Sequence, residues 1–338
     1  MSVQISLANG KSFVTEGRET ILDAALRSGL VLEHSCKTGR CGACKAQLVS
    51  GTSELLGSES GLNLAESDAG WILSCVRQAS SDVLLDVEDL GDLAIHPAKT
   101  VPCRIMALDY LSHDIVRVLL RLPPTQRLDY HPGQYLDLIG KDALRRSYSI
   151  ANAARADNVI ELHIREVPDG AMSGYVFGEA KVNDLLRLNG PLGTFFLRDV
   201  AERELILLAT GTGIAPLKSM LEAMACWPAD RLPLAITVFW GGRVRDDLYW
   251  DPASSGVALD FVPVLSRADA TWAGQRGYVQ QAVLAAFANF DNAVVYACGS
   301  VAMIDGARAE LMAAGLESSR FYADAFVASA HEAVAGPS

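Results

Sequence analysis

The 338-residue sequence predicts a multidomain chain: a small α+β domain, then an antiparallel β-barrel, then an α/β domain with a parallel sheet. Three observations support this. The length exceeds what one ordinary hydrophobic core fills. Short apolar runs that alternate with polar residues follow a compact, cysteine-rich segment. After Ala201 the pattern changes to near-continuous apolar strands separated by helical stretches, one of which is expected near Asp247.

Composition and net charge indicate which kinds of partner the protein is not expected to bind. Half of the residues are hydrophobic, which suffices for several cores, and no stretch approaches the roughly 20 apolar residues of a membrane span. The formal net charge of -11 disfavours nucleic acid, whose phosphates require clustered Lys and Arg. The N-terminus resembles no targeting peptide. We therefore expect a cytoplasmic monomer that contacts neither membrane nor nucleic acid.

The first domain is expected over residues 1–92. A helix is predicted from Glu19 to Ser28, because its apolar residues share one face and Gly29 follows. Four strands are expected, at residues 3–7, 11–15, 45–51 and 83–89. Residues 91–98 contain Gly and Pro without periodicity, which favours a linker.

Four cysteines of this domain have the spacing of an iron-sulfur site. They are Cys36, Cys41, Cys44 and Cys75, in a C-x4-C-x2-C arrangement with the last one far downstream. A zinc site would favour two separated C-x2-C pairs. Residues 35–51 and 74–79 resemble plant-type ferredoxins, which implies a β-grasp fold and a [2Fe-2S] cluster held by these four thiolates. Of the remaining cysteines, Cys103 and Cys226 are expected to be buried as small apolar side chains.

The second domain is expected over residues 99–200. Six short strands and one helix at 172–180 indicate an antiparallel barrel. Residues 146–149 resemble the R-x-Y-S signature of the ferredoxin-reductase superfamily, which binds FAD. The resemblance implies that Arg146 binds the pyrophosphate, that Tyr148 lies against the isoalloxazine, and that Ser149 hydrogen-bonds flavin N5 as a catalytic residue.

Residues 163–173 resemble the second flavin segment of that superfamily. There, Gly170 and Ser173 would bind the diphosphate at a helix N-terminus. The segment 190–196, which resembles the G-P-x-G-x-F turn, follows in the family order. His163 is expected to be a strand residue rather than a catalyst.

The third domain is expected over residues 201–338. A strand runs into Gly211, Thr212 and Gly213 and then a helix, so backbone and helix N-terminus can approach a diphosphate. Because Pro216 replaces the third glycine of G-x-G-x-x-G, a Rossmann dehydrogenase is the poorer match. The segment resembles the G-T-G-x-A-P form of the reductase superfamily.

Two later segments agree with that resemblance. Residues 240–250, with Arg243, Asp247 and Tyr249, resemble the nucleotide-side loop. Residues 296–305 resemble the C-G-x-x-x-M segment, which implies that Cys298 lies beside the nicotinamide as a catalytic residue, with Gly299 and Met303 near the coenzyme. Phe326 is expected near the flavin edge.

Together these segments predict an NAD(P)H-dependent electron-transfer reductase. A flavin accepts two electrons as hydride and releases them singly, which a one-electron cluster requires. Segments throughout the chain, such as 145–153 and 295–308, resemble CDP-6-deoxy-Δ3,4-glucoseen reductases, which imply a CDP-sugar dehydrase as electron acceptor. Residues 163–170 and 321–326 also resemble reductases of aromatic-ring dioxygenases, so an oxygenase component is the alternative. An alternative from another functional class is a protein that is not an enzyme and whose iron-sulfur domain senses redox state.

The coenzyme is expected to be NADH, with NADPH usable. Ser266 and Arg267 follow a strand where NADPH-using relatives bind the 2′-phosphate. The 2′-phosphate is a dianion and requires more than one positively charged neighbour. The residues that follow Arg267 include Asp269, which repels it, and only one further cation, the more distant Arg276. Both reductase families that the chain resembles mostly use NADH.

Overall fold

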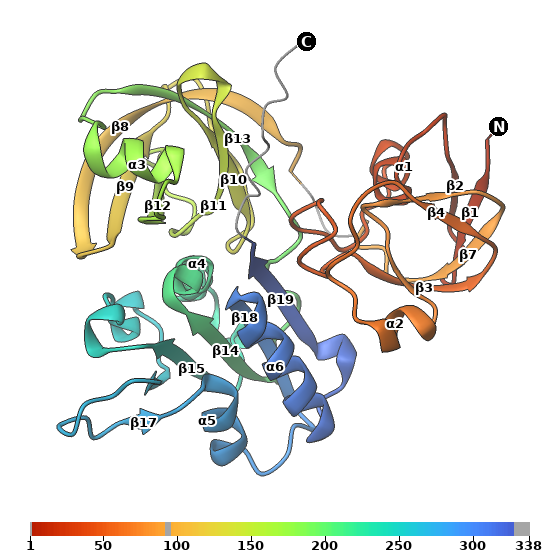
Figure 1. Ribbon diagram of the computed structural model, residues 1–338. Coiled ribbons are helices and arrows are strands. Elements are labelled where there is room, and N and C mark those ends of the chain that lie inside the picture. Colours follow the sequence, from red (N-terminus) through yellow and green to blue (C-terminus); the bar gives the residue numbers. More distant parts are fainter. Residues whose placement is uncertain (1, 92–95, 328–338) are drawn as a thin grey trace.

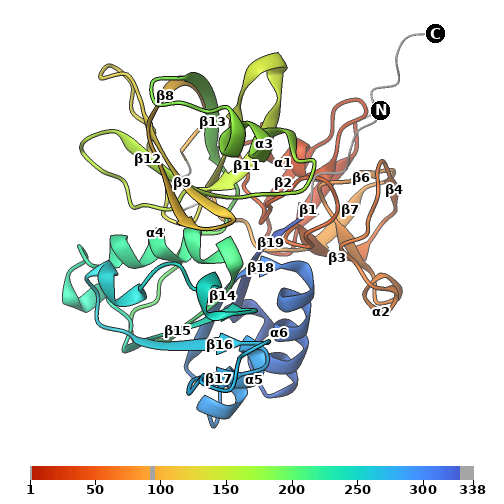
Figure 2. The same ribbon diagram turned by 60° about the vertical axis from the view of Figure 1, so that its left-hand side comes forward.

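The computed structural model describes residues 2–91 and 96–327, and these residues form three lobes (Figure 1). Half of the predicted linker, residues 92–95 of 91–98, lies outside the described part of the chain. In both views the C-terminal strand β19 (Phe321–Phe326) lies where the three lobes meet (Figures 1 and 2). This strand therefore lies next to both the first lobe and the barrel.

The first lobe is a mixed five-stranded sheet in the order β2-β1-β7-β3-β5, packed on one helix. Its strands are β1 (Gln4–Leu7), β2 (Ser12–Val14), β3 (Lys45–Ser50), β5 (Trp71–Leu73) and β7 (Val83–Asp86). The predicted helix is α1 (Ile21–Arg27), and the Thr20 side chain accepts from the Asp23 backbone N–H at its start. The sequence analysis did not predict β5, the pair β4 (Ser53–Leu55) and β6 (Arg77–Ala79), or α2 (Leu64–Asp68).

The second lobe is an antiparallel six-stranded sheet in the order β11-β10-β13-β8-β9-β12. A bridge between Ile150 and Leu162 joins the two ends, so the sheet closes into the predicted barrel. Its strands are β8 (Lys99–Ser112), β9 (Ile115–Arg121), β10 (Tyr135–Ile139), β11 (Arg145–Ser149), β12 (Val159–Arg165) and β13 (Leu185–Leu192). The helix α3 (Ala171–Gly178) packs its buried Met172 and Val176 against the barrel core.

The third lobe is a parallel six-stranded sheet in the order β17-β16-β15-β14-β18-β19. Its remaining strands are β14 (Glu204–Thr210), β15 (Ala235–Gly242), β16 (Asp260–Leu265), β17 (Gln275–Arg276) and β18 (Ala293–Ser300). The helix α4 (Ile214–Met224) covers one face, and α5 (Val279–Ala286) and α6 (Val301–Ala313) cover the other. Burial of both faces explains the near-continuous apolar strands in the sequence.

Two sequence predictions are corrected here. The helix expected near Asp247 is only a 3-10 turn, Arg245–Asp247, because the Asp247 carboxylate accepts from the backbone N–H groups of Arg243 and Val244 and holds a tight loop. Cys226, expected to be buried, is exposed, because it follows the end of α4 and lies off the sheet. Cys103 is buried in the barrel core as predicted.

Candidate functional site

The four predicted cluster cysteines lie close together and form two pairs. The sulfurs of Cys44 and Cys75 are 3.1 Å apart, and the thiols of Cys36 and Cys41 hydrogen-bond each other. Among residues 2–91 and 96–327, no group of three or more Cys, His, Asp or Glu side chains surrounds a single metal-ion position. A [2Fe-2S] cluster takes two thiolates on each of its irons, so the paired arrangement fits that cluster.

The loop around these cysteines requires glycine. Gly39 has a φ of +72°, and a Cβ there would lie 1.9 Å from the Ser58 carbonyl oxygen. The backbone N–H and hydroxyl of Thr38 both donate to the Cys36 sulfur, at 3.4 and 3.2 Å. The Cys41 hydrogen bond, and then these donors, lower the pKa of the Cys36 thiol, which favours the thiolate that iron binds.

The predicted flavin residues lie on β11, beside β10. Ser149 is 7% exposed and pairs with Tyr135, and Arg146 pairs with Leu138. Tyr148 is half-buried against the barrel core, while the Arg146 guanidinium donates to the Arg145 carbonyl at 2.7 Å. Alternation along the strand places Arg146 and Tyr148 on one face. A planar ring and a nearby cation on one face can hold an isoalloxazine and a diphosphate.

The second flavin segment lies at the start of α3. Gly170 is the N-cap residue, and a Cβ there would fall 2.5 Å from the Ser173 hydroxyl. The Ser173 hydroxyl accepts from the Val167 N–H and donates to the carbonyl oxygens of Val167 and Gly170. Ser173 therefore fixes the loop, and the free backbone N–H groups of the first turn remain the donors for an anion.

The predicted nicotinamide residues converge where β14 and β18 end. A Cβ on Gly213 would lie 2.1 Å from the Cys298 carbonyl oxygen, and a Cβ on Gly299 would lie 2.2 Å from the Thr210 hydroxyl. The Met303 methyl group lies beside Gly299, and the Ser300 N–H donates to the Thr210 hydroxyl at 3.2 Å. The glycines thus permit the ends of β14 and β18 and the turn at residues 211–213 to come into contact.

Cys298 is fully buried at the end of β18, next to Ala209 of β14 and Asp324 of β19. Burial raises the pKa of the Cys298 thiol well above its ordinary value, so the thiol is protonated at neutral pH. Burial also raises the pKa of Asp324 to about 6, although a hydrogen bond from Ser35 opposes this shift. Phe326 is 38% exposed at the end of β19, opposite Ser300.

The predicted 2′-phosphate residues are exposed at the ends of β15 and β16. The Arg267 N–H donates to the Arg243 carbonyl at 2.9 Å, so two arginines lie on neighbouring strand ends. Arg276 donates to the carbonyl oxygens of Ala268, Asp269 and Trp272 and thereby fixes the following loop. The nearness of Arg243 to Arg267 was missed because it depends on sheet order.

Tyr249 is half-buried and contacts the barrel. Its hydroxyl is 3.0 Å from His163 Nδ1, and its ring packs edge-on against Trp240. His163 Nε2 is 2.9 Å from the Glu161 carboxylate, and Lys218 is 3.2 Å from the same group. Burial lowers the pKa of His163, so its imidazole is neutral at neutral pH. A neutral ring fits a structural role on the strand. This network joins the barrel to the third domain.

Two further residues at the site escaped the sequence analysis. A Cβ on Gly211 would lie 3.0 Å from Arg165 Nη1, so the Arg165 guanidinium lies beside the turn at residues 211–213. Asp324 is 4% exposed and bonds to the first domain through Ser35. Asp324 could have been found from the sequence, because it is an acidic residue within the apolar run FYADAF. The sequence around Arg165 contains no comparable indication.

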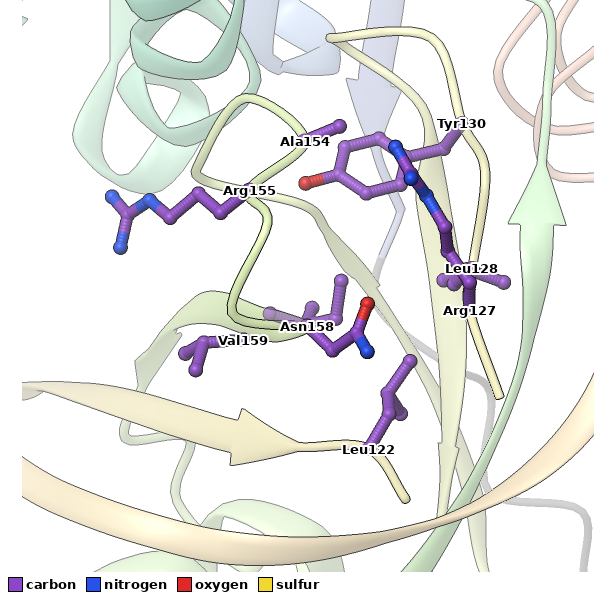
Figure 3. Close-up of a pocket in the computed structure, with 9 residues that line it drawn as sticks. Leu122, Arg127, Leu128, Tyr130, Ala154, Arg155, Asn158 and Val159 are labelled. Carbon is purple, nitrogen blue, oxygen red and sulfur yellow. The ribbon is translucent and has the colours of Figure 1, made fainter. Parts of the chain in front are cut away.

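A small hollow in the barrel lies away from these residues (Figure 3). Leu122, Tyr130, Asn158 and Val159 line it, and its volume is about 10 Å³. That is room for one water molecule. The hollow contains none of the predicted site residues and cannot hold a flavin.

Three family descriptions match the chain. Residues 7–80 match the 2Fe-2S iron-sulfur cluster binding domain, residues 102–197 the Oxidoreductase FAD-binding domain, and residues 207–309 the Oxidoreductase NAD-binding domain. No helix in the described part of the chain has the length and apolar character to cross a membrane.

Several relatives match over nearly the whole chain. The chain is 42% identical to the CDP-6-deoxy-L-threo-D-glycero-4-hexulose-3-dehydrase reductase of Yersinia pestis, over 97% of this chain and 100% of that protein. It is 32% identical to the xylene/toluene monooxygenase electron transfer component XylA of Pseudomonas putida, over 94% and 91% of the two chains. The crystal structure of the Amycolatopsis cytochrome P450 reductase GcoB matches with a TM-score of 0.74 and 28% identity, over 96% and 98%.

The predicted fold and cofactor classes are thereby confirmed: the protein is an oxidoreductase with [2Fe-2S], FAD and NAD-binding domains. The chain belongs to the family of electron-transfer reductases that join an iron-sulfur domain to FAD- and NAD-binding domains.

Proposed function

We propose that this protein passes electrons from NADH through FAD and a [2Fe-2S] cluster to a CDP-sugar dehydrase in deoxysugar synthesis. The observation that carries this proposal is the 42% identity to a dehydrase reductase over the full length of that relative. Identity to the oxygenase-type relative XylA is lower, at 32%. We place the protein in the cytoplasm as a monomer, with domains at residues 1–92, 99–200 and 201–338.

We assign the cluster to the two cysteine pairs, Cys36 with Cys41 and Cys44 with Cys75. Each pair would hold one iron, since its sulfurs are already in contact. The Gly39 turn keeps backbone close to these sulfurs and leaves no space for a side chain.

The flavin site is assigned to the β11 strand and the α3 N-terminus. Ser149 would donate to flavin N5, Tyr148 would pack against the ring, and Arg146 and the N–H groups after Gly170 would bind the diphosphate. When bound, FAD accepts hydride and releases electrons one at a time. The strand position of Ser149 and its low exposure support a dry contact with the ring.

The nicotinamide site is assigned to the converging ends of β14, β15 and β18. Gly211, Thr212 and Gly213 would bind the diphosphate. Cys298, Gly299 and Met303 would orient the nicotinamide toward the flavin edge near Phe326, and the neutral thiol adds no charge to the hydride path. Arg243, Ser266 and Arg267 would bind the adenosine half.

The alternative acceptor is an aromatic-ring oxygenase component. The xylene/toluene relative spans nearly the whole chain, which supports this alternative. The deciding experiment reconstitutes NADH oxidation with a purified CDP-6-deoxy-hexulose 3-dehydrase and its CDP-sugar substrate. Formation of the deoxygenated sugar product is expected. Electron delivery only to a terminal oxygenase would contradict the proposal.

The purified protein is expected to contain one FAD, two irons and two acid-labile sulfides per chain, because the four cysteines and the flavin segments each form one site. Iron, sulfide and flavin analysis measures this directly. Zinc without sulfide would contradict the cluster assignment, and FMN would contradict the flavin assignment.

NADH is expected to have the higher kcat/KM with ferricyanide as acceptor. NADPH should remain usable, because Arg243 and Arg267 both lie at the exposed strand ends. Arg267→Ala should lower kcat/KM for NADPH more than for NADH, whereas Arg231→Ala, whose guanidinium lies over Trp227, serves as the matched control. A tenfold preference for NADPH that Arg267→Ala reverses would show the prediction to be wrong.

A further inference from the structure

The segment Glu33–Ser35, directly before the first cluster cysteine, contacts both other domains. At His34 the backbone N–H donates to the Thr194 hydroxyl at 2.9 Å, and the Thr194 N–H donates back to the His34 carbonyl at 3.0 Å. Glu33 forms an ion pair of 3.3 Å with Arg198. One backbone-to-backbone hydrogen bond and one backbone-to-side-chain hydrogen bond therefore join the first domain to the second at His34.

Ser35 is bonded from two sides. The Tyr135 hydroxyl of β10 donates to the Ser35 carbonyl at 2.7 Å, and the Ser35 hydroxyl donates to the Asp324 carboxylate of β19 at 2.5 Å. Ser35 and Asp324 are 5% and 4% exposed. Buried hydrogen bonds to a charged acceptor are among the stronger ones, and losing one leaves a buried carboxylate without a partner.

The Tyr135 ring is itself fixed in place. A Cβ on Gly193 would lie 2.7 Å from the Tyr135 Cε1 atom, so the ring fills the space beside Gly193, next to Thr194. The cluster cysteine Cys41 also packs against the core of the third domain. The iron-sulfur domain is thus held by contacts on both sides of Cys36.

These contacts join the flavin strand to the cluster. Tyr135 lies opposite Ser149 across β10 and β11, where the Ile150 N–H donates at 3.0 Å to the carbonyl of Gln134, the residue before Tyr135. The Ser35 carbonyl carbon is bonded to the Cys36 nitrogen. A continuous route of covalent and hydrogen bonds therefore leads from the Ser149 strand, through Tyr135 and Ser35, to Cys36. Electron transfer weakens steeply with separation, and domains within a chain move unless their interface fixes them.

We propose that Tyr135, Ser35 and Asp324 form a docking latch that fixes the iron-sulfur domain where electrons pass from flavin to cluster within one molecule. The three are positioning residues, and the proposal rests on the flavin and cluster assignments above. One electron leaves the reduced flavin and one enters the oxidised cluster, so no further reactant is needed.

The test uses the holoenzyme with Ser35→Ala and Tyr135→Phe, singly and together. Hydrogen exchange followed by mass spectrometry should show faster exchange in peptides covering residues 33–36 and 193–195. Anaerobic stopped-flow should show flavin-to-cluster transfer slowed at least about tenfold in the double variant, since two buried hydrogen bonds are lost. Ferricyanide reduction and FAD content should not change.

Matched controls are Tyr110→Phe, whose hydroxyl bonds within the barrel to Phe177, and Ser80→Ala, which bonds within the first domain to Thr52. Ser35→Thr keeps the hydroxyl and should restore transfer. The proposal would be overturned if hydrogen exchange and flavin-to-cluster transfer were both unchanged in the variants. It would also be overturned if ferricyanide reduction fell as much as flavin-to-cluster transfer. If the Ser35→Ala protein loses iron, the exchange and transfer rates of Tyr135→Phe alone test the proposal. A wild-type protein without cluster or NADH oxidation would instead refute the proposed function.

Discussion

Cys75→Ser should reduce cluster content sharply and abolish most NADH-dependent reduction of cytochrome c, while ferricyanide reduction continues. The Cys75 sulfur lies 3.1 Å from that of Cys44 in one of the two thiol pairs, so its loss removes one of the two protein thiolates that would bind one iron. Ferricyanide accepts electrons from the flavin, whose assigned residues lie in other domains. The measurement compares both activities with iron and sulfide content.

The matched control is Cys226→Ser, because Cys226 is an exposed thiol outside the cysteine loop. This variant should keep its iron, sulfide and both activities. A parallel loss of ferricyanide and cytochrome c reduction in Cys75→Ser would contradict the separation of flavin and cluster functions. It would mean that the iron-sulfur domain is needed for the fold of the reductase domains.

Ser149→Ala should slow flavin reduction by NADH by roughly tenfold to a hundredfold, which corresponds to about 1 to 3 kcal/mol for one hydrogen bond in a dry site. The side chain is buried at the end of β11, where water replaces a lost hydroxyl poorly. Single-turnover stopped-flow absorbance of the bound flavin measures the rate.

Ser147→Ala is the control for that variant. Ser147 lies on the same strand but is exposed, and its hydroxyl donates to the Asp137 carboxylate at 2.6 Å. Its rate should stay near that of the unaltered protein. An unchanged rate in Ser149→Ala, with FAD still bound, would remove Ser149 from the mechanism.

Much of the fold could be predicted because the patterns are local. Alternating runs predicted the barrel strands, and apolar strands with helical crossovers predicted the parallel sheet. The cysteine spacing predicted four residues that the fold does bring together in pairs. Short elements such as β5 and α2 were missed, because three to five residues carry too little periodicity.

The contacts between domains could not be predicted from local pattern. Tyr135, Ser35 and Asp324 are far apart in the sequence and meet only because β19 ends where three domains join. The contact of Arg165 with Gly211 and that of Arg243 with Arg267 likewise join residues that are distant in the sequence. The contact of the Tyr249 hydroxyl with His163 across the domain interface also gave no local signal in the sequence.

The most direct test of the account mixes the anaerobic protein with NADH and follows flavin absorbance together with the electron paramagnetic resonance of the frozen sample. The account predicts that the flavin is reduced first and that the cluster then gains one electron at a rate independent of protein concentration, as transfer within one molecule requires. A cluster that stays oxidised, or a rate that rises with protein concentration, would contradict it.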